Sequence, residues 1–90
     1  MSEQFKVLFV CTGNICRSPM AEQMLKANLQ RAGISAVSVE SAGTWAMVGE
    51  SIPKPGQDAM IEAGLKPEPH QARQLDAEMM RGANLVLTAT

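Results

Sequence analysis

The sequence predicts an α/β fold, an open and mostly parallel three-stranded sheet with flanking helices. Three segments of strand length, two apolar and one alternating, lie at residues 5–10, 84–90 and 36–43 respectively, with helix-like segments between them. This order, joined by short connections, is typical of parallel α/β sheets. The chain of 90 residues is long enough for one domain.

The first strand and the first helix have the clearest signals. "FKVLFV" at residues 5–10 is apolar at nearly every position, as expected of a central parallel strand covered on both faces. Ser18 and Pro19 predict the N-cap and the first residue of a helix, because the hydroxyl accepts a free N–H and proline needs no donor there. Apolar residues then recur on one helix face as far as Leu29, and Gly33 provides the stop.

The middle of the chain predicts a second strand and a long loop. "AVSVESAG" at residues 36–43 alternates, with Val37 and Val39 on one side, and runs into a loop. The following residues, 44–56, contain two prolines and two glycines. This composition predicts a loop over the surface.

The last part predicts two short helices and a third strand. One helix is expected over about residues 57–63, with Gly64 ending it. Asp76 predicts the N-cap of another helix, which runs through about Arg81. "NLVLTAT" at residues 84–90 is the third apolar strand.

Composition excludes several classes of function. Eight Lys and Arg against nine Asp and Glu give a net charge of -1, so no broad basic field recruits nucleic acid or an anionic membrane. The start "MSEQFK" lacks the basic and apolar regions of a signal peptide, and no apolar run spans a bilayer. The two cysteines, Cys11 and Cys16, leave no disulfide framework. We therefore expect a single cytoplasmic domain.

The loop after the first strand is the candidate functional site. In open α/β sheets ligands bind outside the carboxyl ends of the strands, where this loop and residues 41–45 both lie. Backbone N–H groups there can curl into a nest, and the helix dipole adds positive potential, so an oxyanion such as phosphate fits. Gly13 lets the loop turn tightly, and the Arg17 guanidinium can grip two oxygens. The predicted phosphate-binding residues are Thr12, Gly13, Asn14, Ile15, Cys16 and Arg17.

Cys11 is the candidate nucleophile of this loop. A cysteine pKa of about 8.5 falls to roughly 3.5–7.5 near helix N-termini or cations. Cys11 would then be a thiolate aimed at the phosphorus of a bound phosphoryl group, with Ser18 donating its hydroxyl to the sulfur.

The stretch "VLFVCTGNICRSPMAE", followed in order by "SAGTW" and "HQAR", resembles the low-molecular-weight protein tyrosine phosphatase family from about Phe5 to Thr90. The resemblance implies the N-terminal part of that fold and a substrate that is a phosphotyrosine protein or a small aryl phosphate. It implies that Cys11 forms a phosphocysteine, that Arg17 binds the phosphoryl oxygens, and that no cofactor takes part.

The resemblance also implies supporting roles. Four side chains would brace the loop by hydrogen bonds, namely Asn14, Ser18, Ser41 and His70. Cys16 matches a second loop cysteine that can bond to the nucleophile and protect it from irreversible oxidation. Trp45 would wall the aryl group of the substrate.

The sequence departs from the family pattern in one respect. The family's general acid is an aspartate in an Asp-Pro loop well after the third strand. The family fold also has a fourth strand and C-terminal helices beyond that strand. No Asp-Pro pair occurs in the chain, since Asp58 and Asp76 both precede alanine, and Glu50 lies near Trp45 in the same predicted loop. We therefore expect an incomplete domain over residues 1–90, an impaired first step, and self-association through the third strand.

Two other functions stay open at this stage. A thiol-dependent arsenate reductase shares this kind of loop, but it needs further cysteines and none follows Cys16. A non-catalytic module would hold phosphate without turning it over. A metal site from Cys11, Cys16 and His70 is not expected, because the spacing is not a zinc pattern.

Overall fold

The computed structural model describes residues 4–89, with three strands and three helices. In chain order these elements are β1 (Phe5–Cys11), α1 (Arg17–Arg31), β2 (Val37–Gly43), α2 (Lys54–Glu62), α3 (Ala77–Gly82) and β3 (Leu85–Thr88).

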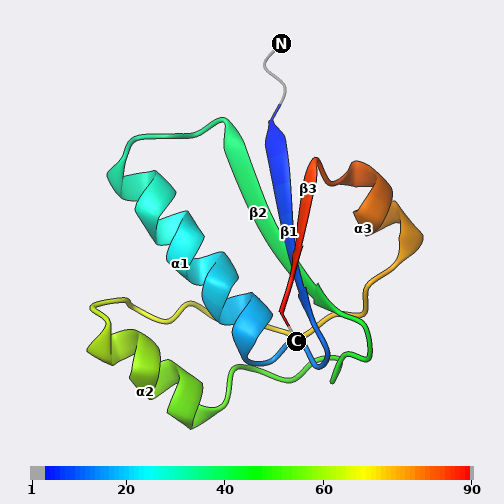
Figure 1. Ribbon diagram of the computed structural model, residues 1–90. Coiled ribbons are helices and arrows are strands. Elements are labelled where there is room, and N and C mark those ends of the chain that lie inside the picture. The colour runs from blue at the N-terminus through cyan, green and yellow to red at the C-terminus, as the bar shows by residue number, and fades with distance from the viewer. Residues whose placement is uncertain (1–3, 90) are drawn as a thin grey trace.

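The strands form one parallel sheet in the order β2-β1-β3 (Figure 1). The central strand β1 places Val7 opposite Val39 of β2 and opposite Leu85 of β3. Because the strands are parallel, their carboxyl ends meet at one edge of the sheet. The predicted α/β fold is confirmed.

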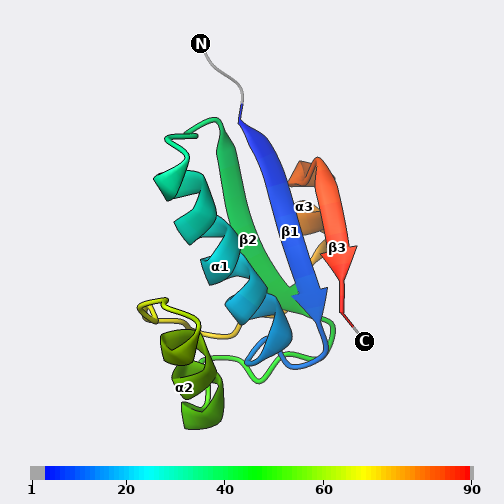
Figure 2. The same cartoon turned by 60° about the vertical axis from the view of Figure 1, so that its left-hand side comes forward.

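Helices cover both faces of this sheet. α1 lies along β1 and β2 on one face, and α3 packs on the other face (Figure 2). Successive residues of β1 are buried, including Val7 and Leu8, so the strand is covered on both sides as predicted. On the α3 side, Leu8 and Val10 form the core with Ala42.

The start of α1 differs from the sequence prediction. The helix begins at Arg17, with Cys16 at the N-cap position and no side-chain capping bond, so the predicted Ser18 N-cap is wrong. The Ser18 hydroxyl instead contacts the buried side chains of Cys11 and Asn14. These tertiary partners take the place of a backbone N–H in the first turn of the helix. Pro19 still lies in the first turn, where its missing N–H costs nothing.

Three other boundaries shift by a few residues. β2 extends to Gly43, so Ser41 lies within the strand instead of after it. α2 begins at Lys54, earlier than expected, because Pro55 fits the first turn of a helix. β3 is confined to Leu85–Thr88, while Asn84 pairs with Lys6 through its side chain and backbone; Thr90 lies outside the described residues.

Several predicted signals are confirmed. Gly33 follows α1 with φ 70°, and Gly64 follows α2 with φ 84°, the left-handed conformation that ends helices. The Asp76 carboxylate accepts a hydrogen bond of 2.8 Å from the Met79 N–H and so caps α3. Across residues 4–89, the helices are too short or too polar to cross a membrane.

Candidate active site

The Cys11 loop, residues 11–17, joins the end of β1 to the start of α1. Its backbone pairs with the segment that follows β2, because the carbonyl of Cys11 accepts from the Thr44 N–H at 3.0 Å and that of Thr12 from the Trp45 N–H at 2.9 Å. A third bond of 3.0 Å joins the Gly13 carbonyl to the Met47 N–H. These carbonyls therefore point toward the neighbouring segment. N–H groups of the loop can then point inward, toward the Cys11 sulfur.

Gly43, the last residue of β2, makes this close approach possible. A Cβ atom at Gly43 would lie 2.5 Å from the Thr12 carbonyl oxygen and 3.1 Å from Ala46. Real Cβ atoms do not approach backbone oxygen so closely. The Cys11 loop can therefore lie against β2 only because residue 43 has no side chain.

The Cys11 thiol lies at the floor of the loop, where it is buried. Its sulfur is 2.9 Å from the Ser18 hydroxyl oxygen. Burial raises the pKa of Cys11, whereas the Ser18 hydroxyl and three backbone N–H groups lower it by more, so the pKa lies below the usual value. These N–H groups belong to Ser18, Asn14 and Cys16. The nest thus surrounds the sulfur with donors that stabilise the thiolate.

Asn14 is the centre of the polar network beneath the loop. The residue is fully buried and adopts φ 56°, so the left-handed residue of the tight turn is Asn14 and not its neighbour Gly13. Its side-chain amide donates to the hydroxyls of Ser18, at 2.8 Å, and Ser41, at 3.0 Å. His70 Nε2 lies 2.7 Å from its backbone oxygen. The structure thus brings together, from three separate segments of the chain, the four residues Asn14, Ser18, Ser41 and His70.

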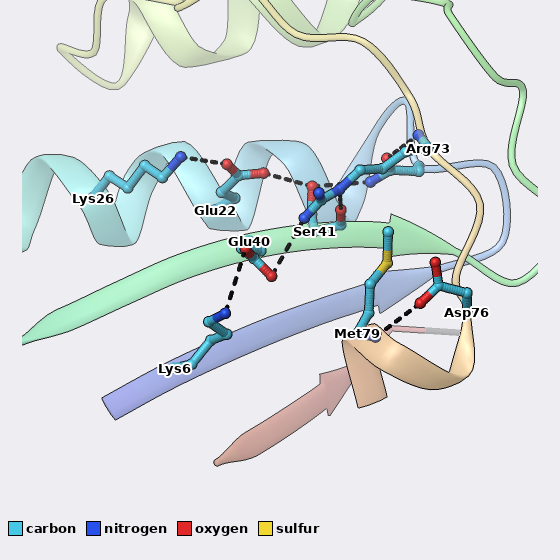
Figure 3. A network of polar contacts seen from close by, with 9 residues as sticks. Lys6, Glu22, Lys26, Glu40, Ser41, Arg73, Asp76 and Met79 are labelled. Atoms are coloured by element: carbon cyan, nitrogen blue, oxygen red, sulfur yellow. Dashed lines mark hydrogen bonds and ion pairs between the residues drawn. The ribbon is translucent and has the colours of Figure 1, made fainter. Parts of the chain in front are cut away.

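Two residues that the sequence analysis did not single out join this network (Figure 3). Glu22 accepts a hydrogen bond of 2.5 Å from the Ser41 hydroxyl and pairs with Lys26. Arg73 donates its backbone N–H to Asn14 Oδ1 at 2.8 Å and its Nε to the Ser41 carbonyl at 2.9 Å. One signal for Glu22 was present, since it lies one turn after Ser18 on the same face of the helix.

The remaining candidates belong to the Cys11 loop or to the segment after β2 that bonds to it. Thr12, Cys16 and Arg17 are exposed, and Arg17 occupies the first position of α1. The Trp45 side chain is 82% exposed, beside the loop to which its backbone bonds. Cys11 and Cys16 are both free thiols. No group of three or more metal-ligating side chains occurs in the part of the chain that the structure describes.

Together the fold and the site define a class of protein, a parallel α/β domain in which hydrogen-bond donors converge on a thiol of lowered pKa at the carboxyl end of the central strand. The family model described as "Low molecular weight phosphotyrosine protein phosphatase" matches residues 6–90. The chain belongs to this family, and the resemblance found in the sequence is confirmed.

Relatives with known names support the assignment. The low molecular weight protein-tyrosine-phosphatase Ptp of Acinetobacter johnsonii is 44% identical over 85 residues, which cover 93% of this chain and 56% of that protein. A protein-arginine-phosphatase of Bacillus subtilis is 39% identical over 84 residues, covering 93% of this chain and 55% of that protein. The chain therefore spans about half the length of the curated relatives it matches.

The fold is shared with solved structures as well. The chain is similar to YwlE arginine phosphatase, solved as a cysteine-to-serine mutant with a phosphorylated active site serine, at a TM-score of 0.87 and 37% identity. The match covers 96% of this chain and 55% of that one.

Proposed function

We propose that the chain holds the phosphoryl-transfer site of a cysteine-dependent phosphatase that hydrolyses phosphotyrosine or other aryl phosphate monoesters. The observation that carries this proposal is the buried Cys11 thiol, whose pKa is lowered by donors converging on its sulfur. A thiolate fixed below a nest of N–H groups is placed to attack a phosphorus atom bound there. In the YwlE mutant the active site serine is phosphorylated, so a side chain at that relative's active site can carry a phosphoryl group.

In the first step, the Cys11 sulfur attacks phosphorus, forming an S–P bond while the P–O bond to the aryl group breaks. The aryl oxygen leaves with the bonding electrons and takes up a proton. The N–H groups of residues 12–17 and the Arg17 guanidinium stabilise the charge on the phosphoryl oxygens. The catalytic residues are thus Cys11 and Arg17, with Ser18 at the sulfur.

In the second step, water attacks the phosphocysteine. The new P–O bond forms as the S–P bond breaks, the sulfur leaves as a thiolate, and the water proton passes to solvent. The Ser18 hydroxyl, 2.9 Å from the sulfur, stabilises the departing thiolate.

The other residues of the site have supporting roles in this proposal. Asn14, Ser41 and His70 hold the Cys11 loop in shape, a role supported by the contacts of Asn14. Trp45 provides an apolar wall for the aryl group, and its exposed side chain beside the loop supports this role. Cys16 forms a disulfide with Cys11 after a peroxide oxidises the Cys11 thiolate to a sulfenic acid, and the disulfide forms with loss of water.

The leaving group decides how fast the first step runs in this chain. A positioned general acid contributes roughly 10²–10⁴-fold. Because these 90 residues contain no Asp-Pro pair, we propose that this stretch by itself supplies no positioned aspartate to protonate the leaving aryl group. Phosphotyrosine, with its basic leaving group, is then a slower substrate than esters of acidic phenols.

The test is the phosphatase rate against aryl phosphates that span a range of leaving-group pKa, with Cys11→Ser as the blank. A steep fall in rate as the leaving group becomes more basic is expected. A shallow dependence contradicts the missing-acid claim, because some carboxylate then donates the proton. Equal rates for the native chain and Cys11→Ser overturn the phosphatase proposal and leave an oxyanion-binding module.

Phosphoarginine is the second candidate substrate, because the protein-arginine-phosphatase of Bacillus subtilis is among the similar proteins. The same assay with a phosphoarginine peptide and a phosphotyrosine peptide separates the two substrates. Retention of activity toward phosphoarginine alone assigns the site to P–N bond cleavage.

We also propose that this chain self-associates and acts in the cytoplasm. Within residues 4–89, β3 pairs with β1 alone, and its Leu85 and Leu87 are each 42% exposed. Such an edge favours pairing with another strand. A monodisperse monomer in sedimentation at micromolar concentration contradicts self-association.

The proposed location in the cytoplasm is supported by the two thiols. Cys11 and Cys16 are both free, which fits a reducing compartment.

A further inference from the structure

The edge segment, residues 70–75, lies along the free side of β2 at its carboxyl end. Gly43 donates its N–H to the Arg73 carbonyl at 2.9 Å, and its own carbonyl accepts from the Leu75 N–H at 2.8 Å. Gly43 and Gln74 form a parallel bridge. The edge segment thus acts as a short additional strand, and it fixes where the Arg73 backbone meets Asn14.

The Arg73 side chain crosses from this segment onto β2 (Figure 3). Its Nε donates to the Ser41 carbonyl at 2.9 Å, and its Nη2 lies 3.4 Å from Glu40 Oε2. Ser41 is only 2% exposed, and a buried carbonyl needs a donor. Glu40 is also 3.9 Å from the Lys6 ammonium. The Arg73 guanidinium therefore bonds the acceptors of two neighbouring residues of β2, the Ser41 carbonyl and the Glu40 carboxylate.

These contacts connect Arg73 to the nucleophile through a short series of bonds. The Arg73 N–H fixes Asn14 Oδ1, which orients the Asn14 amide toward the Ser18 hydroxyl. That hydroxyl contacts the Cys11 sulfur. Arg73 itself does not contact the sulfur in this series, so any effect it has on the thiol is through position.

We propose that Arg73 is a positioning residue of the site, whose guanidinium fixes the edge segment on β2 and thereby fixes Asn14 and Ser18 beneath the nucleophile. Its role in turnover depends on the proposed phosphatase function, but its role in positioning does not. The planar guanidinium is essential because Nε and Nη2 bond two acceptors at once, and a lysine ammonium on a flexible stem does not reproduce this geometry.

The experiment measures the rate of Cys11 alkylation by iodoacetamide across pH, in a Cys16→Ser background so that one cysteine reacts. Arg73→Met removes both the charge and the donors, whereas Arg73→Lys keeps the charge and loses the planar group. Arg81→Met, at an exposed arginine of α3, is the matched control. Far-UV circular dichroism and thermal unfolding of each variant report folding.

Both Arg73 variants are expected to slow alkylation at acidic pH by about 2- to 30-fold, the range for a residue that acts through others, while Arg81→Met leaves the rate unchanged. A native rate in Arg73→Lys with a slow rate in Arg73→Met overturns the proposal, because charge alone then explains the effect. Native rates in both variants overturn it as well. If Arg73→Met does not fold, Arg73→Lys decides. Alkylation needs no turnover, so this result is independent of the phosphatase assay.

Discussion

The Ser18 hydroxyl oxygen lies 2.9 Å from the Cys11 sulfur, although the two residues come from different elements, α1 and β1. Ser18 is 1% exposed, so water does not compete for this contact. The same hydroxyl accepts from the Asn14 amide at 2.8 Å, which leaves its own proton free to point at the sulfur. The contact therefore joins the network beneath the loop to the reacting atom.

Removal of this hydroxyl is expected to raise the pKa of Cys11 and to slow turnover. Ser18→Ala deletes the side-chain hydrogen bond that lowers the pKa, while burial continues to raise it. A hydrogen bond to a charged group contributes about 1.5–3 kcal/mol, so the step in which the thiolate departs slows by about 10- to 150-fold. The measurements are the pH dependence of alkylation and the rate of phosphocysteine hydrolysis after rapid mixing. An unchanged alkylation profile contradicts the role given to Ser18.

The stability of the fold is expected to rise with pH through the range in which Cys11 ionises. The pKa of Cys11 is lowered in the folded chain, while the unfolded chain keeps the ordinary value of about 8.5. Between these two values the unfolded state holds a proton that the folded state has lost, so raising the pH favours folding. The contribution is complete above the unfolded pKa and is lost as the pH falls through the folded one.

Urea unfolding of the native chain and of Cys11→Ser, from about pH 6 to pH 9, measures this contribution as the difference between the two curves. The difference should grow toward alkaline pH, and Ser18→Ala should make it grow less. A difference that stays constant across this range rules out a thiolate stabilised by the fold.

Asn14 allows the backbone and the side chain to be tested separately. Asn14→Gly tolerates φ 56° but removes the polar contacts, which costs about 1–3 kcal/mol of unfolding free energy because buried partners lose their bonds. Asn14→Ala removes the same contacts and adds about 1–2 kcal/mol of backbone strain. Thermal or urea unfolding should therefore rank the native chain first, Asn14→Gly second and Asn14→Ala third. Equal stability of the two variants contradicts the strain at this residue.

Gly43→Ala is expected to displace the Cys11 loop. Its Cβ would meet the Thr12 carbonyl oxygen at 2.5 Å, so the loop or the strand must shift, at a cost of about 1–3 kcal/mol. Gly82→Ala is the matched control, because the nearest atom to its Cβ is Lys6 Nζ at 3.9 Å. The free energy of unfolding, measured in urea, and the phosphatase rate should both fall in Gly43→Ala and stay near native in Gly82→Ala. Native activity in Gly43→Ala contradicts the close approach.

Local sequence signals predicted most of the frame of the site. The apolar run of β1, the glycine after α1 and the Asp76 cap depend on neighbours within a few residues, so pattern and capping rules were sufficient. The N-cap predicted for Ser18 was wrong for the same reason, although its predicted contact with the Cys11 sulfur was right. Its local preference is a helix cap, but a buried thiol and amide from the tertiary fold bind the hydroxyl instead.

The polar support of the loop was less accessible to sequence reasoning. Arg73 meets Asn14 across a separation of 59 residues, and although Arg73 lies in the matched stretch "HQAR", that match assigned it no contact. Glu22 looks like an ordinary member of an exposed Glu–Lys pair on a helix, and its second contact, with Ser41, appears only when β2 packs against α1.

The pairing of β1 with residues near the other end of the chain orders events during synthesis. Cys11 leaves the ribosome early, but its sulfur acquires a fully oriented set of donors only after residues 70–73 have emerged and folded back onto Asn14. The sheet closes later still, because Lys6 pairs with Asn84. Until then Cys11 is an ordinary, mostly protonated thiol. The Cys11 thiol is therefore expected to become reactive only after the segment that fixes Asn14 has been synthesised and has folded.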